Sequence, residues 1–187
     1  MDQRILDAAL DLYGRVGWLG FNLDAVAKGA KVSKDALYRR WPTREALIAD
    51  ALRARWDWVA GIDTGAIRED LIALCERAFD TFAGTYGEVA LQLRADARRF
   101  PEVSLFEEPY REQTMRLARD IVLRAIARKE LPASARPSLV MDLLIGGITN
   151  HILSTPPRLR EQMLAKVDDF VREMVDVVLT GVRGVAD

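Results

Sequence analysis

The chain of 187 residues contains a single cysteine, Cys75, and a single histidine, His151. One cysteine cannot form an intrachain disulfide or a cysteine-cluster zinc site, and one histidine excludes a multi-histidine metal site. A glycine-rich phosphate loop and a nucleophile-elbow motif are also missing from the sequence. We therefore expect no metal, no cofactor and no enzymatic activity.

The sequence also lacks a run of the roughly 20 apolar residues that a membrane-spanning helix needs. Charged residues interrupt the N-terminus where a signal peptide carries its apolar core, so we expect a cytoplasmic protein. Hydrophobic residues make up 50% of the chain and charged residues 29%, a balance typical of a folded globular protein rather than a disordered one.

Segments with strict alternation of polar and apolar residues are missing too, which argues against a β-sheet. Apolar residues recur instead at helical spacing, and the sequence predicts an all-α fold. We expect about nine helices, near residues 1–16, 22–30, 33–41, 43–60, 67–83, 88–100, 109–129, 138–154 and 158–182. Two glycines in the segment 61–65 mark a domain boundary. It would separate an N-terminal three-helix domain at 1–48 from a helical domain at 61–187, with the fourth helix as the connection between them.

The stretch from Asn22 to Arg44 has the pattern of two short helices joined by a tight corner. Asn22 and Ser33 are good N-caps for the two helices, and Pro42 ends the second. Thr43 can cap the helix that follows. Such a pair forms a helix-turn-helix, whose second helix enters the major groove of DNA.

The charge of the chain is distributed to match this interpretation. Residues 1–55 hold ten Lys/Arg against seven Asp/Glu, whereas residues 56–187 hold seventeen against twenty-one. A basic end on an acidic body suits binding of DNA through that end, although ordinary surface variation also gives an excess of this size.

The chain resembles the tetracycline-repressor (TetR/AcrR) family of bacterial regulators. The resemblance is strongest from Ile5 to Ala51 and rests on residues at fixed spacing: Val26-Ala27, Val32-Ser33, Leu37-Tyr38, Trp41 and Arg44-Glu45-Ala46-Leu47. A segment from Ala127 to Leu131 is similar to one in many C-terminal domains of the family. The family often has glycine where this chain has Lys31, so a left-handed backbone there would cost roughly 1 kcal/mol.

Eight residues at the second helix and just after it are the candidate DNA contacts. Arg39 can donate a bidentate pair of hydrogen bonds to guanine, and Asp35 either accepts from cytosine or complements the helix dipole. Phosphate contacts are expected from Lys34, Tyr38 and Arg40; for the arginines the alternative is a solvated helix surface. The resemblance implies phosphate contacts by Tyr38 and Arg44. The full candidate set is Lys34, Asp35, Ala36, Tyr38, Arg39, Arg40, Thr43 and Arg44.

The last two predicted helices carry a wide apolar stripe, which forms either a homodimer interface or ordinary intrachain core. The resemblance implies a four-helix bundle with two helices from each subunit. Two glycines would permit close helix approach or mark a kink. The candidate interface residues are Gly146, Gly147, Met163, Val167, Phe170, Val171, Met174 and Val178.

The resemblance also implies a pocket for a small-molecule effector in the middle helices. The residue types there suit a largely apolar ligand with a few polar anchors, and plain core packing is the alternative at each position. The candidates are Phe79, Phe82, Tyr86, Leu93, Phe106, Tyr110, Met115, Met141, Asn150 and His151. Cys75 lies on an apolar face and is expected to be inert core.

The expected function is therefore that of a transcriptional regulator, by family default a repressor. It would bind a palindromic operator as a dimer, and a small ligand would release it. The alternatives are a helical interaction protein that does not bind DNA and, against the absences above, an enzyme. Tyr38, Arg39, Arg40 and Arg44 favour DNA binding.

Overall fold

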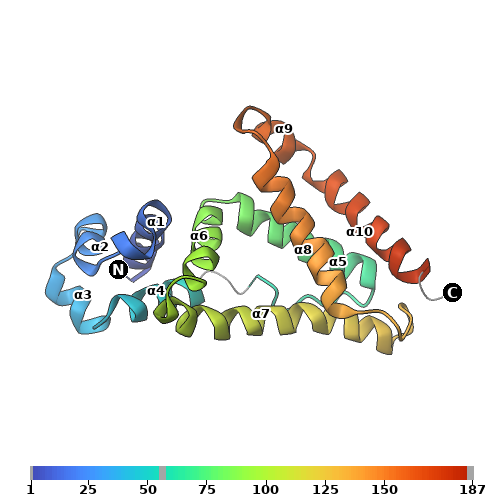
Figure 1. Cartoon of the computed structure of the whole chain (residues 1–187), viewed down its shortest axis with the longest axis horizontal. Coiled ribbons are helices and arrows are strands. Elements are labelled where there is room, and N and C mark those ends of the chain that lie inside the picture. Colours follow the sequence, from blue (N-terminus) through green and yellow to red (C-terminus); the bar gives the residue numbers. More distant parts are fainter. Residues whose placement is uncertain (1, 55–57, 185–187) are drawn as a thin grey trace. The chain divides into compact units, whose positions relative to one another are not determined.

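The structure is a computed structural model that describes residues 2–54 and 58–184. These residues form ten α-helices and one 3-10 turn. No strand is found among them, which agrees with the all-α fold expected from the sequence (Figure 1). None of the described helices is long and apolar enough to cross a membrane. The elements are α1 Asp2–Gly20, α2 Leu23–Ala30, α3 Lys34–Arg40, α4 Arg44–Arg53, α5 Ile67–Ala83, α6 Gly87–Ala97, α7 Pro101–Ala127, α8 Pro137–Ser154, η1 Pro157–Leu159, α9 Arg160–Ala165 and α10 Val167–Gly184.

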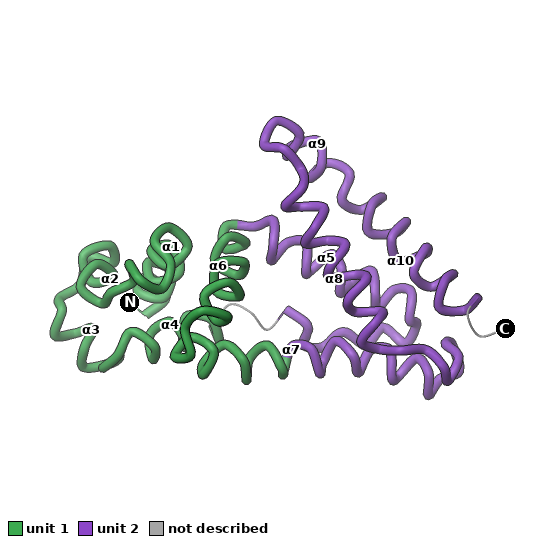
Figure 2. The backbone as a smooth tube through the Cα atoms, viewed as in Figure 1, with its two compact units in different colours: residues 1–57, 85–113 green, residues 58–84, 114–187 purple. Residues whose placement is uncertain are grey.

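The chain divides into two compact units, coloured separately in Figure 2. Unit 1 comprises residues 1–57 and 85–113, and unit 2 comprises residues 58–84 and 114–187. Helix α6 and the first half of α7 therefore belong to the same unit as the predicted helix-turn-helix. The sequence analysis assigned residues 85–113 to the second domain.

Unit 1 is built around α1, which packs against α2, α4 and α6. Leu10 and Tyr13 of α1 are fully buried, as are Leu37 of α3 and Leu47 of α4. A Cβ atom at Gly14 would lie 3.0 Å from Cγ2 of Val89 in α6. The missing side chain at this position therefore allows α1 and α6 to approach closely.

Unit 2 has its core between α5, α8 and α10. Cys75 of α5, Leu144 of α8 and Val171 of α10 are fully buried there. Burial raises the pKa of the Cys75 thiol to about 12. A thiol with so high a pKa carries almost no thiolate at neutral pH, which agrees with the expected inert core cysteine.

Several helix boundaries differ from the predictions. Helix α4 ends at Arg53 rather than near Ala60; residues 58–61 form turns, and 55–57 lie outside the described residues. The final predicted helix is interrupted at Lys166, whose backbone is not helical, which gives ten helices instead of nine. These boundaries depend on packing, which local sequence patterns do not report.

The third difference concerns the helix predicted to begin at Pro109. Helix α7 begins at Pro101 instead and continues through Pro109. Pro101 fits the first turn of a helix because its missing N–H has no intrahelical partner there. Pro109 removes one backbone hydrogen bond inside α7, and the exposed position of its ring allows water to solvate the carbonyl group that loses its donor.

Within unit 2, the segment Ala127–Leu131 stabilises the start of α5 and the loop before it through hydrogen bonds and ion pairs. Arg128 pairs with the fully buried carboxylate of Asp70 and with Glu130. Asp70 accepts hydrogen bonds from the backbone and the hydroxyl of Thr64 at 2.6 and 2.8 Å, and Glu130 accepts from the backbone N–H of Ile67 at 2.6 Å. These bonds give a structural role to the second segment on which the family resemblance rests.

Candidate nucleic-acid interface

The corner between α2 and α3 has the predicted caps. The side chain of Asn22 accepts a hydrogen bond from Ala25 N at 2.9 Å, and Ser33 Oγ accepts one from Ala36 N at 3.2 Å. Helix α4 begins in the same way, because Thr43 Oγ1 accepts from the N–H of Ala46 at 3.2 Å. Each bond satisfies an N–H that a helix leaves without an intrahelical partner.

Lys31 ends α2 in the left-handed conformation, with φ 54° and ψ 48°. Its backbone N–H donates to carbonyl groups of the last turn of α2, and its side chain is exposed. Lys31 therefore meets the condition under which the sequence predicts a cost of roughly 1 kcal/mol relative to glycine.

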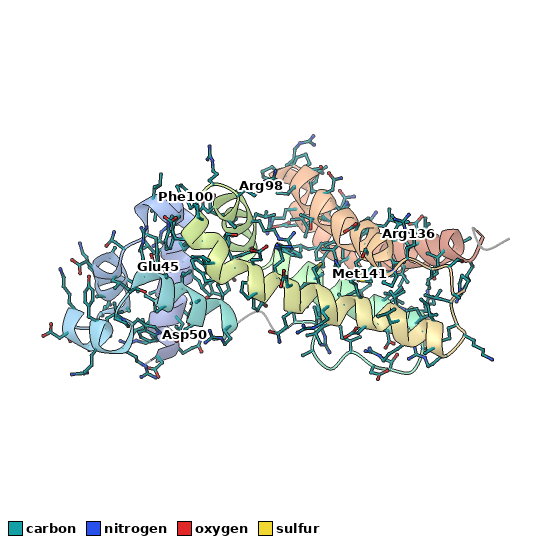
Figure 3. The ribbon with its side chains drawn as sticks, turned by 60° about the horizontal axis from the view of Figure 1, so that its bottom comes forward. Glu45, Asp50, Arg98, Phe100, Arg136 and Met141 are labelled. Carbon is teal, nitrogen blue, oxygen red and sulfur yellow. The ribbon has the colours of Figure 1, made fainter. Side chains whose placement is uncertain are left out.

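Helix α3 has one buried side and one exposed side. Leu37 is fully buried and Trp41, which follows the helix, is 4% exposed. The indole N–H of Trp41 donates to Asp50 of α4 at 2.9 Å; Asp50 is labelled in Figure 3. The candidate contacts Lys34, Asp35, Tyr38, Arg39 and Arg40 are all exposed, and Ala36 is half-buried. The exposed face of α3 therefore carries the side chains that the sequence assigned to DNA.

Two acidic residues outside α3 pair with cations on this face. Asp24 of α2 forms an ion pair with Lys34, and its other oxygen accepts from Tyr38 Oη at 3.4 Å. Asp2 of α1 forms an ion pair with Arg40. The hydrogen bond from Lys34 to Asp24, followed by the charge of Asp24, raises the pKa of the lysine. The sequence does not predict these two pairings, because both acids belong to other helices.

Arg44 contacts the interior of unit 1. Its Nη1 donates to the backbone carbonyls of Trp18 and Phe21 at 3.1 and 3.2 Å. Its guanidinium carbon lies 3.8 Å from the centroid of the Trp18 ring, within range of a cation–π interaction. These contacts connect Arg44 to the end of α1. Its side chain is 33% exposed, so only part of its surface is available to DNA.

Trp18 is held by unit 1 on several sides. Its backbone N–H donates to the buried carboxylate of Asp96 in α6 at 2.9 Å, and the same carboxylate accepts from Tyr13 Oη at 2.8 Å. The indole N–H donates to Glu102 of α7 at 2.9 Å, a bond that lowers the pKa of Glu102. Burial, then the bond to Asp96, raises the pKa of the Tyr13 phenol.

The bond from Trp18 N depends on a break in α1. Gly17 has φ 62° and ψ −172°, a combination essentially restricted to glycine. The helix predicted near residues 1–16 thus continues beyond the break to Gly20. The break turns the following N–H away from the helix and toward Asp96.

The predicted effector residues divide between the two units. Unit 1 contains Tyr86, Leu93, Phe106 and Tyr110, and unit 2 contains Phe79, Phe82, Met115, Met141, Asn150 and His151. Phe79, Phe82, Leu93 and Met141 are buried, and Asn150 is exposed; Figure 3 labels Met141 on α8.

Unit 1 also contains two charged side chains that the sequence does not predict to be buried or shifted in pKa, Glu107 and Arg94. Glu107 is only 6% exposed, and burial raises its pKa although Arg111 lowers it. Burial lowers the pKa of Arg94. A glutamate on a helix beside apolar residues gives little sequence signal, because its burial depends on which helices surround it.

His151 lines a hollow of about 530 Å³ within unit 2. Its ring stacks on Phe170 of α10, with centroids 4.0 Å apart and an interplanar angle of 13°. The hollow is also lined by Thr155, Leu159, Gln162, Met163, Lys166, Asp169 and Glu173. Of the predicted effector residues, His151 lines this hollow.

The predicted interface residues are partly buried within the chain. Met163, Val171 and Val178 are buried, while Val167, Phe170 and Met174 are half-buried. A Cβ atom at Gly147 would lie 2.9 Å from the sulfur of Met174, so this glycine permits close approach of α8 and α10 in one chain. Gly146 faces open space.

Four large apolar residues that the sequence analysis missed are exposed on α8 and α10. They are Leu139, Leu143, Leu153 and Val177, with exposures of 45, 50, 61 and 65%. On α8 the leucines share one helical face with Gly146. Their spacing is visible in the sequence, but spacing alone does not distinguish this face from the buried one.

Two family models match the chain. One is described as bacterial regulatory proteins, tetR family, and matches residues 5–51. The other is described as the tetracyclin repressor-like C-terminal domain and matches residues 62–178. Together they cover the helix-turn-helix and most of the remaining helices.

Individual proteins with the same kind of description are also similar. The transcriptional regulator AqdR of Rhodococcus erythropolis is 31% identical over 155 residues, which are 82% of this chain and 73% of that protein. The DNA-binding transcriptional repressor TetR of Mycobacteroides abscessus is 42% identical over 73 residues, 37% of each chain. The solved structure of GusR from Salmonella enterica has a TM-score of 0.71 at 18% identity and covers 96% of this chain and 95% of its own.

Proposed function

Because the chain belongs to the TetR family of helix-turn-helix transcriptional regulators, not enzymes, we propose that it is a repressor. It binds a palindromic operator as a homodimer, and a small, largely apolar molecule releases it. The observation that carries this proposal is the exposed face of α3, where Lys34, Tyr38, Arg39 and Arg40 stand opposite the buried Leu37.

Within the proposed complex the exposed residues have different roles. Arg39 reads a guanine, because its guanidinium fork matches the two acceptors in the major groove. Lys34, Tyr38 and Arg40 contact phosphates and fix the position of α3 in the groove. Asp35 is exposed and either accepts from a cytosine or complements the N-terminal end of α3. Ala36 allows the helix to approach the bases closely.

Thr43 and Arg44 form the edge of the proposed interface. Thr43 Oγ1 caps α4, so the backbone N–H groups at this helix start are the better phosphate donors. The guanidinium of Arg44 is bound to Trp18 and Phe21, and we assign to it a mainly structural role beside any phosphate contact.

The proposed dimer uses the exposed apolar face of α8 and α10. Leu139, Leu143 and Leu153 on α8 and Val177 on α10 are exposed, and burying such side chains against a second copy is favourable. Gly146 has open space where a side chain would begin, which suits close contact with a partner helix. Two half-sites about one helical turn apart on DNA require such a two-fold assembly.

The proposed effector is largely apolar because most of the predicted pocket residues are aromatic or aliphatic. Within unit 2, Phe79, Phe82 and Met141 are buried side chains of this kind. His151, which lines a hollow in the same unit, offers a polar anchor.

The experiment that tests this function is selection of bound duplexes from a randomised pool, followed by titration of the selected site. We expect a palindromic site bound by two subunits. Arg39→Ala should weaken binding by about 1–3 kcal/mol and relax the preference at one base pair in each half-site. Selection of no common sequence by the wild-type protein, or unchanged binding by Arg39→Ala, would overturn the proposed reading of DNA.

A matched control is available on the same unit. Arg53 is an exposed arginine on α4 that pairs only with Asp50 in the described structure. Arg53→Ala removes the same charge as Arg39→Ala but should leave the base preference unchanged. The comparison separates a specific contact from the loss of one positive charge.

A further inference from the structure

The three cations exposed on α3 differ in their partners. Lys34 pairs with Asp24 of α2, and Arg40 pairs with Asp2 of α1. Arg39 makes no ion pair with the residues that the structure describes. The two cations proposed to contact phosphate are thus neutralised by acids from other helices, and the cation proposed to read a base is not.

Asp24 differs from Asp2 because it contacts two of the proposed phosphate-binding residues at the same time. One carboxylate oxygen contacts Lys34 Nζ and the other lies 3.4 Å from Tyr38 Oη. Lys34 and Tyr38 are one helical turn apart on α3, so they stand side by side on one face. A phosphate that approaches this face meets Asp24 as a competitor for both donors.

Stability does not require the pair between Asp24 and Lys34. The two side chains are 49 and 62% exposed, and an ion pair so exposed contributes little to folding. The caps at Asn22 and Ser33 and the buried Leu37 already hold the corner. The main effect of the Asp24 carboxylate is therefore on the binding of other anions, such as DNA phosphates, to the exposed face of α3.

We propose that Asp24 is a specificity-determining residue that limits sequence-independent binding of DNA. When DNA binds, a phosphate takes Lys34 and Tyr38 from Asp24, and the carboxylate is left close to the negatively charged backbone. Phosphate contacts supply essentially all of the affinity for non-specific DNA. Asp24 thus lowers that affinity and leaves a larger share of operator binding to the base contact of Arg39. This inference rests on the proposed function.

The test is the substitution Asp24→Asn, which keeps the size of the side chain and an acceptor for Tyr38 but removes the negative charge. The probe is a mixed-sequence DNA duplex of about 30 bp, titrated from about 50 to about 200 mM salt. We expect binding to strengthen about threefold to tenfold at low salt and the slope of log K against log salt to steepen by about 0.9, the value for one phosphate contact.

Asp11→Asn is the matched control. Asp11 forms an exposed ion pair with Arg15 on α1, so its substitution changes the net charge by the same amount in the same unit but off α3. Its affinity should rise much less. If Asp24→Asn and Asp11→Asn bind the duplex alike, the inference is overturned, because net charge alone then explains the gain.

Two further measurements keep the outcome decisive. If Asp24→Asn does not fold, as circular dichroism would report, Asp24→Ser removes the same charge with another residue suited to the start of a helix. In a Lys34→Gln background the gain from Asp24→Asn should fall by at least about half, because the competition for Lys34 is gone; an undiminished gain contradicts the mechanism.

A wild-type protein that binds neither the duplex nor a selected site refutes the proposed function itself.

Discussion

The exposed face of α3 and the exposed face of α8 and α10 differ in chemistry. On α3 the exposed residues are charged or polar, and two cations have acidic partners on other helices. On α8 and α10 the exposed residues include Leu139, Leu143, Leu153 and Val177. A charged surface exchanges its ions and water readily, whereas an exposed apolar face is stabilised by lasting coverage. The exposed face of α3 therefore suits a partner that binds reversibly, and the exposed face of α8 and α10 suits a partner that stays bound.

The largest effect should come from a charge placed on the apolar face. Leu143→Glu would bury two unpaired carboxylates in a symmetric interface, one from each subunit, and should weaken dimerisation by about 4 kcal/mol. Sedimentation at micromolar concentration should then show monomers. Leu105→Glu, at a 78% exposed leucine in unit 1, is the control. A Leu143→Glu protein that remains a dimer would refute the assignment of this face.

The next effect concerns the polar interior of unit 1. Asp96→Ala removes the acceptor of Tyr13 Oη and Trp18 N, and two buried donors without partners should cost about 3 kcal/mol of stability. Urea unfolding at fixed protein concentration measures this loss. Asp11→Ala, which breaks an exposed pair, should cost less than about 1 kcal/mol. Equal losses in the two variants would show that the buried network contributes nothing special.

A smaller effect distinguishes Arg44 from Arg39. Arg44→Ala removes two hydrogen bonds to backbone carbonyls and the contact with the Trp18 ring, and it should destabilise the protein by about 2 kcal/mol. Arg39→Ala should leave the unfolding transition unchanged, since Arg39 is exposed. If Arg44→Ala weakens DNA binding without any loss of stability, its role is that of a phosphate contact.

The smallest effect should be a gain. Lys31→Gly relieves a left-handed lysine at φ 54° and should stabilise unit 1 by about 1 kcal/mol. Thermal unfolding would detect the gain. Lys31→Ala serves as the comparison, because it removes the charge but keeps the Cβ atom, and it should give no such gain.

The features that the sequence predicted correctly are local ones. Asn22, Ser33 and Thr43 cap the helices they precede. Each of these depends on a few neighbouring residues, whose hydrogen bonds are determined within one turn of helix. The same holds for the all-helical fold, which follows from apolar spacing.

The features that the sequence did not predict depend on residues far apart in the chain. Asp96 meets Tyr13 and Trp18 across about eighty positions, and the acids opposite Lys34 and Arg40 come from α2 and α1. Apolar periodicity cannot tell which face of α8 remains exposed, because both faces carry leucines. Such pairings require knowledge of which helices pack together.

The left-handed Gly17 makes one short segment unusually sensitive to substitution. In a saturation mutagenesis experiment, Arg15, Val16 and Leu19 should accept many replacements, because their positions are exposed. Position 17 should accept almost none, since any Cβ atom there meets a disfavoured backbone and lies about 3.1 Å from Gln92 Nε2. The number of tolerated substitutions should therefore fall sharply at position 17 compared with its exposed neighbours.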